Sequence, residues 1–477
     1  MIQPKEGIIS YEVHISSHII EMKTPLMAKT LFSILFITHS ILNLCAQATT
    51  LDDYIDIAIK ENLSIKKDFL HVEKSNAQII QANKLWNPQI DLNSSYLFAR
   101  GGRVLSFPIG DLFNPTYEAL NAISGTQSFP TNLENERIQL TPNNFLDAQL
   151  SISKPLVNSN LKYNQLIKQE LAKLNALDQV ITKREIIYQV KTAYYNILKS
   201  HHGKKIIQQN KGLLSELLEF NKTLVKYDKA TENVITEVEF QLSTLQKELA
   251  LIEEQQKLAE SYFNLLLNRD FNEVITIDTT LSERLERKIS AIEQLQEEAA
   301  NTRIEFDQIA AGQHINDLNI ERISKNKNPN LGVTAGLGYQ AEDFDFDLGG
   351  PLYTLGFGLS WNIIDGGLRK QRIQELKIDK EILDNNKAQL TQKIELDVLQ
   401  AYLGLNSLQA QLNAQSSAIK NAQQSYDIIK SKYDNNNALL IELLQAQNQL
   451  STAKLSKVIL AHDYLSQLAK LDKELSR

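Results

Sequence analysis

Cysteine, glycine and proline are all scarce in this sequence. The chain of 477 residues has 1 cysteine, 18 glycines and 10 prolines. Inside a helix, glycine costs about 1 kcal/mol and proline about 3 kcal/mol relative to alanine, so their scarcity favours long uninterrupted helices. The single cysteine, Cys45, excludes a disulfide within the chain and any site built from several thiolates.

A surplus of positive charge is also missing. The formal net charge is -7 at pH 7, whereas a nucleic-acid surface needs a basic stripe. The composition therefore argues against a nucleic-acid partner.

Motifs for catalysis, cofactors and metals are missing as well. The sequence has no phosphate-binding glycine loop followed by Lys and Ser or Thr, and no nucleophile elbow. His201 and His202 are adjacent, so on a helix they point in different directions and cannot share a metal ion. Gly366 and Gly367 lack the spacing of a dinucleotide fingerprint. We therefore predict no enzyme, no cofactor and no metal site.

The N-terminus has the pattern of a signal peptide. Lys29 precedes an apolar run, Leu31–Leu44, that is shorter than the roughly 20 residues of a membrane-spanning helix. Ala46 and Ala48 follow, as in an Ala-x-Ala cleavage site. Residues 1–46 are therefore predicted to be a targeting segment.

Two details of this segment have alternatives. Residues 1–21 fit no part of a signal peptide, so the natural start is predicted at Met22 or Met27. A lipid on Cys45 is an alternative to simple cleavage, although Leu44 is large where a small residue is expected.

The remaining chain contains two copies of one plan. Ser153–Lys162 opens a long helical stretch in the first half, and Ser360–Arg369 does the same in the second half. We predict two structural repeats, 51–285 and 286–473, each reading helix, strand, loop, strand, long helix, break and helix. Later matching positions are Val190 with Val398, Ala193 with Ala401, and Tyr194 with Tyr402.

Helices are predicted over most of each repeat. The opening helices are expected at 51–85 and 286–326, and each ends before a proline. The long helices, at 161–226 and 368–432, would each extend about 100 Å at about 1.5 Å per residue. In the second, apolar residues recur about every 3.5 residues, which is the period of a left-handed coiled coil.

Four short segments alternate apolar residues with polar or small ones. They are expected at about 89–99, 147–155, 330–340 and 353–362. This length and alternation suit transmembrane barrel strands, although water-soluble sheets also alternate. The aromatic residues expected to face lipid are Tyr96, Phe98, Tyr339, Phe357 and Trp361.

The number of strands favours an oligomer. Four strands cannot close a barrel, and each unpaired backbone group at a sheet edge costs several kcal/mol in hydrocarbon. If these segments span a bilayer, several chains must share one barrel. The alternative is a periplasmic or surface coiled-coil structural protein with small soluble β-domains and no pore.

Similar motifs follow the two long helices. Tyr433–Gln447 contains a Tyr and then a polar stretch rich in Leu, Ala and Gln, and Tyr227–Gln241 is a weaker first copy. Ile363–Gly367 follows the fourth strand as a strand-to-helix junction. In this order, these motifs resemble the outer membrane efflux protein (TolC) family over almost the whole chain after the targeting segment.

This resemblance implies an α+β, mostly α, membrane protein. The family forms a trimer with a 12-stranded β-barrel, four strands from each chain, above a coiled-coil tunnel in the periplasm. The implied function is the outer-membrane channel of an efflux or secretion system in a Gram-negative bacterium, with a periplasmic adaptor and an inner-membrane transporter as partners. The transported substrate cannot be read from the chain, because discrimination lies mainly with the pump.

The resemblance also assigns roles to the hairpin tips. Ala230 and Asn436 replace the family's glycine; Asn tolerates positive φ, whereas Ala230 must turn differently or accept strain. The family's tyrosine at the second tip pairs with an acid of the first tip, but the matching position is Thr236, so no lock of that form is expected. The residues assigned to adaptor docking and gating are Tyr227, Ala230, Thr236, Tyr433 and Asn436.

Two positions match the acidic lining of the family's narrowest opening. Glu442 keeps an acid there, and Gln445 replaces one. Three copies of Glu442 around a threefold axis would form a cation-attracting aperture ring. The alternative is that Glu442 is a solvated helix charge.

A long insertion separates the first two strands. Residues 100–145 include apolar stretches such as Phe107–Gly110. Their length is typical of external decoration or a disordered loop, and a lid over the barrel mouth is the alternative.

Overall fold

The computed structural model describes residues 50–140, 143–278, 289–342 and 350–477. The predicted targeting segment, with the alternatives at Met22, Met27 and Cys45, lies outside these residues. Residues 51–275 and 279–477 form one compact unit. All elements named below belong to this unit.

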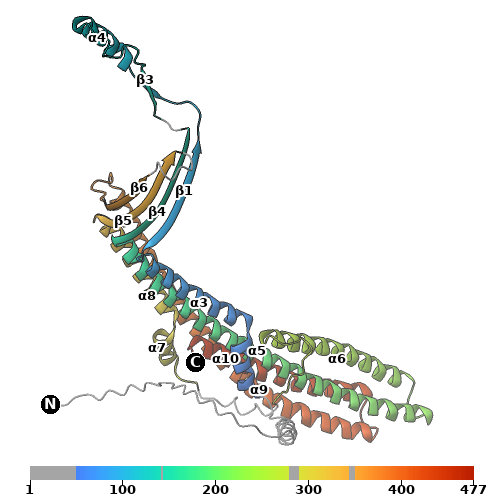
Figure 1. The fold of residues 1–477 in the computed structure, drawn as a ribbon. Coiled ribbons are helices and arrows are strands. Elements are labelled where there is room, and N and C mark those ends of the chain that lie inside the picture. The colour runs from blue at the N-terminus through green and yellow to red at the C-terminus, as the bar shows by residue number, and fades with distance from the viewer. Residues whose placement is uncertain (1–49, 141–142, 279–288, 343–349) are drawn as a thin grey trace, which may run out of the picture. The chain divides into compact units, whose positions relative to one another are not determined.

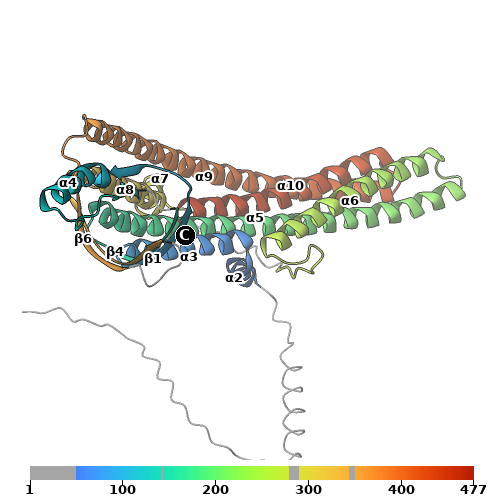
Figure 2. The same ribbon diagram turned by 45° about the horizontal axis from the view of Figure 1, so that its top comes forward.

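Two helical hairpins make up most of the unit. The first pairs α5 (Ser159–Lys226) with α6 (Asn233–Leu266), and the second pairs α9 (Leu368–Asp434) with α10 (Leu440–Glu474). Figure 2 shows each pair side by side, and α10 also packs against α5. The long helices α5 and α9 have 68 and 67 residues, as the scarcity of glycine and proline predicts.

Apolar seams hold the hairpins together. Ile207 and Leu214 of α5 pack in one cluster with Val238 of α6 and with Leu440 and Leu443 of α10. Burying one such side chain stabilises a fold by about 1.5–3 kcal/mol. The seven-residue spacing of Ile207 and Leu214 is the spacing of one coiled-coil position.

The first repeat opens with two helices, where the sequence predicts a single helix over 51–85. They are α2 (Leu51–Glu61) and α3 (Leu63–Lys84), and both pack against α5. The side-chain oxygen of Asn62 accepts hydrogen bonds from the N–H groups of Ser64 and Ile65. This N-cap begins a new helix and interrupts the predicted one.

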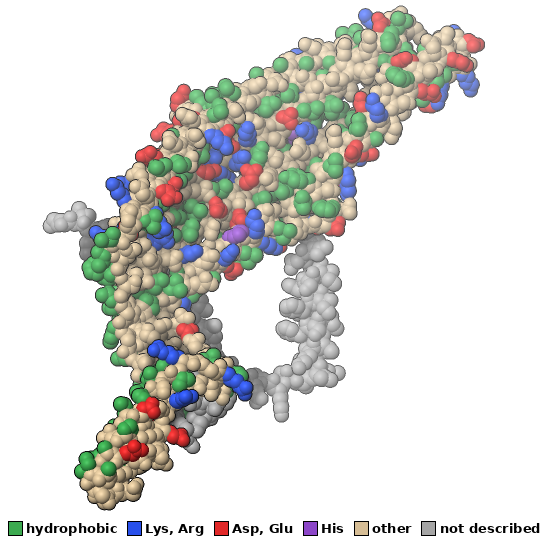
Figure 3. Space-filling model, turned by 90° about the horizontal axis from the view of Figure 1, so that it is seen from above, with side chains coloured by type: hydrophobic (Ala, Val, Ile, Leu, Met, Phe, Trp, Pro, Cys, Tyr) green, Lys and Arg blue, Asp and Glu red, His purple; other side chains and the backbone are tan. Residues whose placement is uncertain are grey.

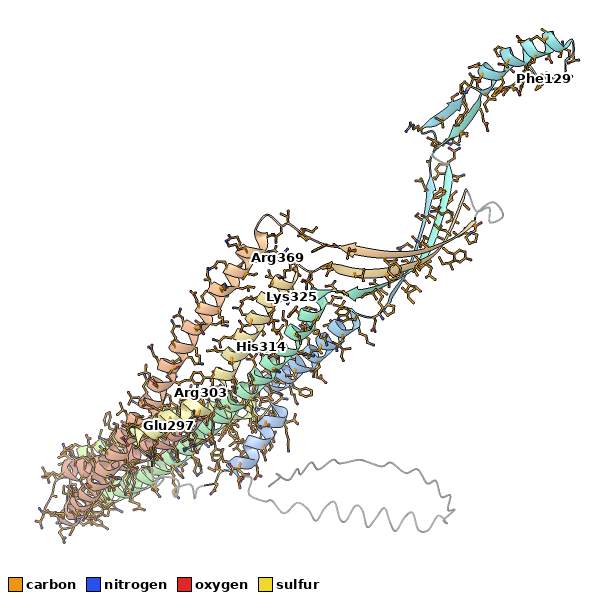
Figure 4. All side chains as sticks on the ribbon, turned by 90° about the vertical axis from the view of Figure 1, so that its left-hand side faces the viewer. Phe129, Glu297, Arg303, His314, Lys325 and Arg369 are labelled. Atoms are coloured by element: carbon orange, nitrogen blue, oxygen red, sulfur yellow. The ribbon has the colours of Figure 1, made fainter. Side chains whose placement is uncertain are left out.

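The second repeat shows the same kind of break. The helix predicted over 286–326 is α7 (Ile292–Thr302) followed by α8 (Glu305–Lys325), and both pack against α9. Arg303 between them has an extended backbone, with φ -75 and ψ 114, and is labelled in Figure 4. Residues 286–288 lie outside the described part of the chain.

One antiparallel sheet contains all four predicted strands. Its order is β1-β4-β5-β6, so β1 and β6 are its edge strands (Figure 1). Each observed end lies within three residues of the predicted one. The strands are β1 (Gln89–Phe98), β4 (Asn144–Val157), β5 (Asn330–Glu342) and β6 (Gly350–Ser360). The central pair β4–β5 therefore joins the two predicted repeats.

The insertion between β1 and β4 contains regular structure. β2 (Val104–Phe107) pairs with β3 (Glu136–Gln139), and α4 (Ile109–Ser124) lies between them in the chain. Gly125, with a φ of 62, ends α4 in the left-handed conformation that favours glycine. Residues 104–139 are therefore not a disordered loop, and external decoration and a lid stay as the two predictions for this insertion.

Candidate functional site

The strand register places most of the apolar residues of all four strands on one face of the sheet. Residues directly opposite in antiparallel strands share a face, and Leu150 pairs with Leu92 on one side and Leu337 on the other. We call this the apolar face. It contains Ile90, Leu92, Tyr96, Phe98, Leu146, Ala148, Leu150, Ile152, Val333, Ala335, Leu337, Tyr339, Leu355, Phe357 and Leu359.

The apolar face is exposed in the single chain. Leu92 is 71% exposed, and Leu355 and Phe357 are each 70% exposed. A contiguous exposed apolar patch of this kind marks a membrane or protein contact. The opposite face has mostly polar or small residues, among them Asp91, Asn93, Gln149, Ser151, Thr334, Gly336 and Gly356, with Leu97, Phe145 and Leu352 as apolar exceptions.

The predicted lipid-facing aromatics lie toward the two ends of the sheet. Tyr96, Phe98 and Tyr339 lie on the apolar face toward the end where β1 finishes. Trp361 directly follows β6 at the other end, where its indole N–H donates a hydrogen bond of 2.8 Å to the carbonyl of Lys327. Phe357 lies on the same face between them. Aromatic residues in barrel proteins form such bands at both membrane interfaces, so facing lipid remains the prediction for these five.

The predicted strand-to-helix junction is a capped turn. The carboxylate of Asp365 accepts hydrogen bonds from the N–H groups of Gly367 and Arg369, at 3.2 and 3.1 Å. Gly366 and Gly367 have φ values of 63 and 87, a conformation that other residues rarely adopt. The two glycines therefore form the turn that redirects the chain from β6 into α9.

The first hairpin tip turns without strain at Ala230. The left-handed residue there is Asp228, with a φ of 50. The N–H of Lys229 donates to the carbonyl of Leu224 at 2.8 Å, which is the long hydrogen bond of a Schellman motif. The tip thus turns two residues before Ala230.

The second tip uses the same motif at a different place relative to its tyrosine. Asn436, with a φ of 56, is the left-handed residue, and the N–H of Asn437 donates to the carbonyl of Lys432 at 2.8 Å. As a result, Tyr433 lies inside α9 and is 8% exposed, whereas Tyr227 caps α5 and is 66% exposed. The two tyrosines that match in sequence are therefore not equivalent in the structure.

Tyr433 finds its partner on the long helix of the first hairpin. Its hydroxyl donates a hydrogen bond of 2.7 Å to the side-chain oxygen of Asn221, which is fully buried. Thr236, the position matched by sequence, is exposed on α6. A second buried amide pair, Gln447 with Asn210 at 2.6 Å, also joins the two hairpins.

The sequence contains a signal for Asn221 that the motif comparison missed. Ile207, Leu214 and Asn221 follow at seven-residue intervals in α5. An asparagine at a position otherwise filled by apolar residues is a polar group in a coiled-coil seam, and such a group needs a specific partner.

Glu442 and Gln445 lie on one exposed face near the start of α10, three residues apart. The carboxylate of Glu442 accepts a hydrogen bond of 2.8 Å from the N–H of Leu439. This contact caps the helix and fixes the direction of the acid. The aperture ring remains a prediction, because it needs three copies.

A partly buried ionic cluster joins the end of α10 to the α7–α8 break. Arg303 donates to Glu474 of α10 and to Glu305 of α8, and Arg184 of α5 also donates to Glu305. Burial raises the pKa of Glu305, but the hydrogen bonds from Arg184 and Arg303 outweigh it and lower the pKa to about 2. This cluster explains why the chain holds an extended residue at Arg303.

His202 contacts a third histidine in addition to its neighbour His201. The Nδ1 of His202 lies 3.0 Å from the Nε2 of His462 on α10. Burial, helped by the nearby His202 and Lys199, lowers the pKa of His462 to about 4. Burial also lowers the pKa of His202. Both rings are therefore neutral at pH 7, and one donates to the other.

The described residues lack a metal-binding cluster and a membrane-spanning helix. No group of three or more His, Cys, Asp or Glu side chains is placed to bind a metal ion. No described helix has the length and apolar character needed to cross a membrane.

Comparison with known proteins gives a family match to the second half of the chain. Residues 295–476 match the model of the outer membrane efflux protein family. No curated protein sequence matches significantly.

Solved channel structures share this fold. CusC, whose crystal structures describe conformational changes during folding and transmembrane channel formation, is 15% identical to this chain with a TM-score of 0.71. The match covers 90% of this chain and 92% of that one. VceC from Vibrio cholerae is 13% identical with a TM-score of 0.67, covering 89% and 95%. The CmeC outer membrane channel from Campylobacter jejuni is 15% identical with a TM-score of 0.68, covering 89% and 85%.

The mostly helical α+β fold of this chain is therefore the fold of known outer-membrane channels. The match of residues 295–476 to the outer membrane efflux protein family agrees with the prediction from the motifs. This is a family of transport channels and not of enzymes.

Proposed function

We propose that this protein is the outer-membrane channel of a tripartite efflux or secretion system, working as a homotrimer without catalytic activity. Substrates enter from an inner-membrane transporter and a periplasmic adaptor and leave through the barrel. The protein would lie in the outer membrane of a Gram-negative bacterium and extend into the periplasm.

The open four-stranded sheet is the observation that supports this proposal most directly. It combines an exposed apolar face with two edge strands, β1 and β6. In hydrocarbon, the backbone groups at those edges need partners. Three copies that pair β1 of one with β6 of the next would close a 12-stranded barrel, with the apolar face toward lipid and the polar face toward the pore.

The hairpin tips supply the periplasmic end of the channel in this proposal. Adaptor docking is assigned to the exposed tip around Tyr227 and Ala230 and to the second tip around Asn436. Three copies of Glu442 and Gln445 line the aperture there. An acidic ring attracts cations at a constriction.

Membrane extraction and electrophoresis test the proposal together. The full chain should need detergent to leave the outer membrane, should migrate as a trimer until heated, and should give single-channel currents in planar bilayers. A coiled-coil structural protein without a pore would conduct no current. A water-soluble monomer that leaves lipid vesicles intact would contradict the proposal.

A further inference from the structure

Residues 104–140, which we call the cap module, are held together by hydrogen bonds from one face of α4. Asn114 and Asn121 lie seven residues apart and therefore on the same side of the helix. Asn114 exchanges two hydrogen bonds of 2.8 Å with the backbone of Leu133. Asn121 exchanges bonds of 2.8 and 2.9 Å with the backbone of Phe129, labelled in Figure 4. This face is therefore occupied by the returning chain.

The opposite face of α4 is an exposed heptad seam. Leu112, Thr116, Ala119 and Ile123 follow at steps of four, three and four residues, the spacing of a and d positions in a coiled coil. Leu112 is 64% exposed and Ile123 is 84% exposed. Figure 3 shows hydrophobic side chains at the surface over this helix.

The middle of this seam is suited to close helix contact. Ala119 is small, and the hydroxyl of Thr116 donates a hydrogen bond of 3.0 Å to the carbonyl of Leu112. That bond satisfies the only polar side-chain atom of the seam within the helix itself. A second helix can therefore cover the seam without leaving a polar group unpaired.

We infer that the α4 seam packs against the α4 seams of the other copies, so that three cap modules meet on the pore axis. This inference rests on the proposed trimeric channel. Three symmetry-related helices in mutual contact must surround the threefold axis, and in the proposed trimer that axis is also the axis of the pore.

The charge of the cap module favours a protein over lipid as the partner that covers the α4 seam. Helices that lie on anionic membrane surfaces are rich in Lys and Arg on their polar face. α4 has neither residue. Within the whole module Arg137 is the single basic residue, and the acidic residues are Asp111, Glu118, Glu134 and Glu136. An uncharged seam on an acidic module fits another copy of itself better than an anionic lipid surface.

The cap module begins at the proposed interface between neighbouring copies. β1 is an edge strand, and its last residue, Phe98, pairs with the first residue of β4, Asn144. β6 begins at the same end of the sheet, at Gly350. In the proposed barrel, β1 pairs with β6 of the next copy, so each module continues directly from an interface between copies.

The β2–β3 ribbon is long enough to reach the axis. Twelve strands about 4.8 Å apart, tilted by about 40°, enclose a barrel with a radius of about 12 Å. β2 has 4 residues, and at about 3.3 Å per residue a ribbon of that length spans about 13 Å. Gly101 and Gly102 precede it with φ values of 83 and 124, which allows the ribbon to bend away from the wall.

Tethering compensates for the small size of the seam. A helix of 16 residues associates weakly when it is free in solution. Three helices fixed to one barrel, however, meet at a millimolar effective concentration or higher. The assembled cap would narrow the exit of the channel.

Cysteine cross-linking tests the inference. In the full chain with Cys45→Ser, purified trimers of Ile123→Cys are oxidised and compared with Glu118→Cys, an exposed position far from the seam on the same helix. We expect at least tenfold more linked dimer from Ile123→Cys. As an independent readout, Leu112→Asp with Ile123→Asp should at least double single-channel conductance, while Glu118→Gln should leave it unchanged.

The outcomes separate this inference from the proposed function. Intact trimers that give no link at Ile123→Cys, or equal links at both positions, overturn the meeting of α4 helices and leave the channel proposal standing. An unmodified chain that is not trimeric in detergent overturns the proposed function, and the inference falls with it. Selective linking together with raised conductance supports the cap.

Discussion

The hydroxyl of Tyr433 donates a hydrogen bond of 2.7 Å to Asn221, although the two residues lie 212 positions apart in the chain. Burial raises the pKa of Tyr433, so the hydroxyl stays protonated and remains a donor. The amide of Asn221 also donates to the carbonyl of Leu217 at 2.9 Å, which fixes its orientation. This bond joins the two hairpins close to the proposed aperture.

Tyr433→Phe is expected to destabilise the protein by about 1–3 kcal/mol, because it leaves the buried oxygen of Asn221 without a donor. Thermal and urea unfolding measure the loss. A double-mutant cycle with Asn221→Leu should give a coupling of about 1 kcal/mol. Tyr227→Phe is the control, since Tyr227 is exposed, and a loss as large as that of Tyr433→Phe would contradict the assignment.

Glu442→Gln is expected to lower the preference of the channel for cations at least twofold. The amide keeps an oxygen that can accept from Leu439, so the change removes the charge and largely spares the cap. Reversal potentials in bilayers under a salt gradient give the permeability ratio. Glu239→Gln, which removes an exposed acid of α6, should leave the ratio unchanged; an equal shift in both variants would show that Glu442 is only a solvated charge.

The cluster at Glu305 should make stability depend on acid pH. The pKa of Glu305 in the folded chain, about 2, lies below the ordinary value of 4.5. As the pH falls, Glu305 therefore binds a proton in the unfolded chain at a higher pH than in the folded chain. Its contribution is fully present above about pH 4.5 and is lost as the pH falls toward 2. Urea unfolding at several pH values should show this slope in the native chain and a flatter one in Glu305→Gln.

Glu305→Gln should also cost about 2–4 kcal/mol at neutral pH, because Arg303 and Arg184 lose a charged partner. Glu248→Gln, at an exposed acid of α6, is the matched control and should change little. Equal stability of the two variants would mean that the cluster does not hold the α7–α8 break in place.

The histidine pair should produce a second pH dependence at higher pH. The folded pKa of His462 is about 4, below the ordinary 6.5, so protons bind the unfolded chain preferentially between these values. Stability should therefore decline as the pH falls from about 6.5 to 4. His462→Gln should reduce that slope, whereas His71→Gln, at an exposed residue of α3, should leave it intact. An unchanged slope in His462→Gln would refute the assignment.

Local patterns in the sequence predicted much of the fold. Alternation places the strands within three residues of β1, β4, β5 and β6, because a two-residue period depends only on neighbouring side chains. The coiled-coil period and the scarcity of proline likewise predict the long helices α5 and α9. The motifs after those helices predict the family, which the match to residues 295–476 confirms.

The sequence did not predict the helix breaks or the positions of the tip turns. The interruption at Asn62 follows from a cap that the sequence allows but does not require. The break at Arg303 depends on partners from α5 and α10. Likewise, sequence matching pointed to Ala230 as the turning residue, but α5 ends earlier and Asp228 takes the left-handed conformation.

The sequence by itself determined the four strands of the main sheet, the long helices, which of their faces are apolar, and the resemblance to the outer membrane efflux protein family. Only the tertiary structure decided which polar residues meet: Tyr433 with Asn221, Gln447 with Asn210, and His202 with His462. The reason is physical. Periodicity fixes the face on which a residue lies, but the height at which one helix packs against another depends on the summed packing of the whole seam.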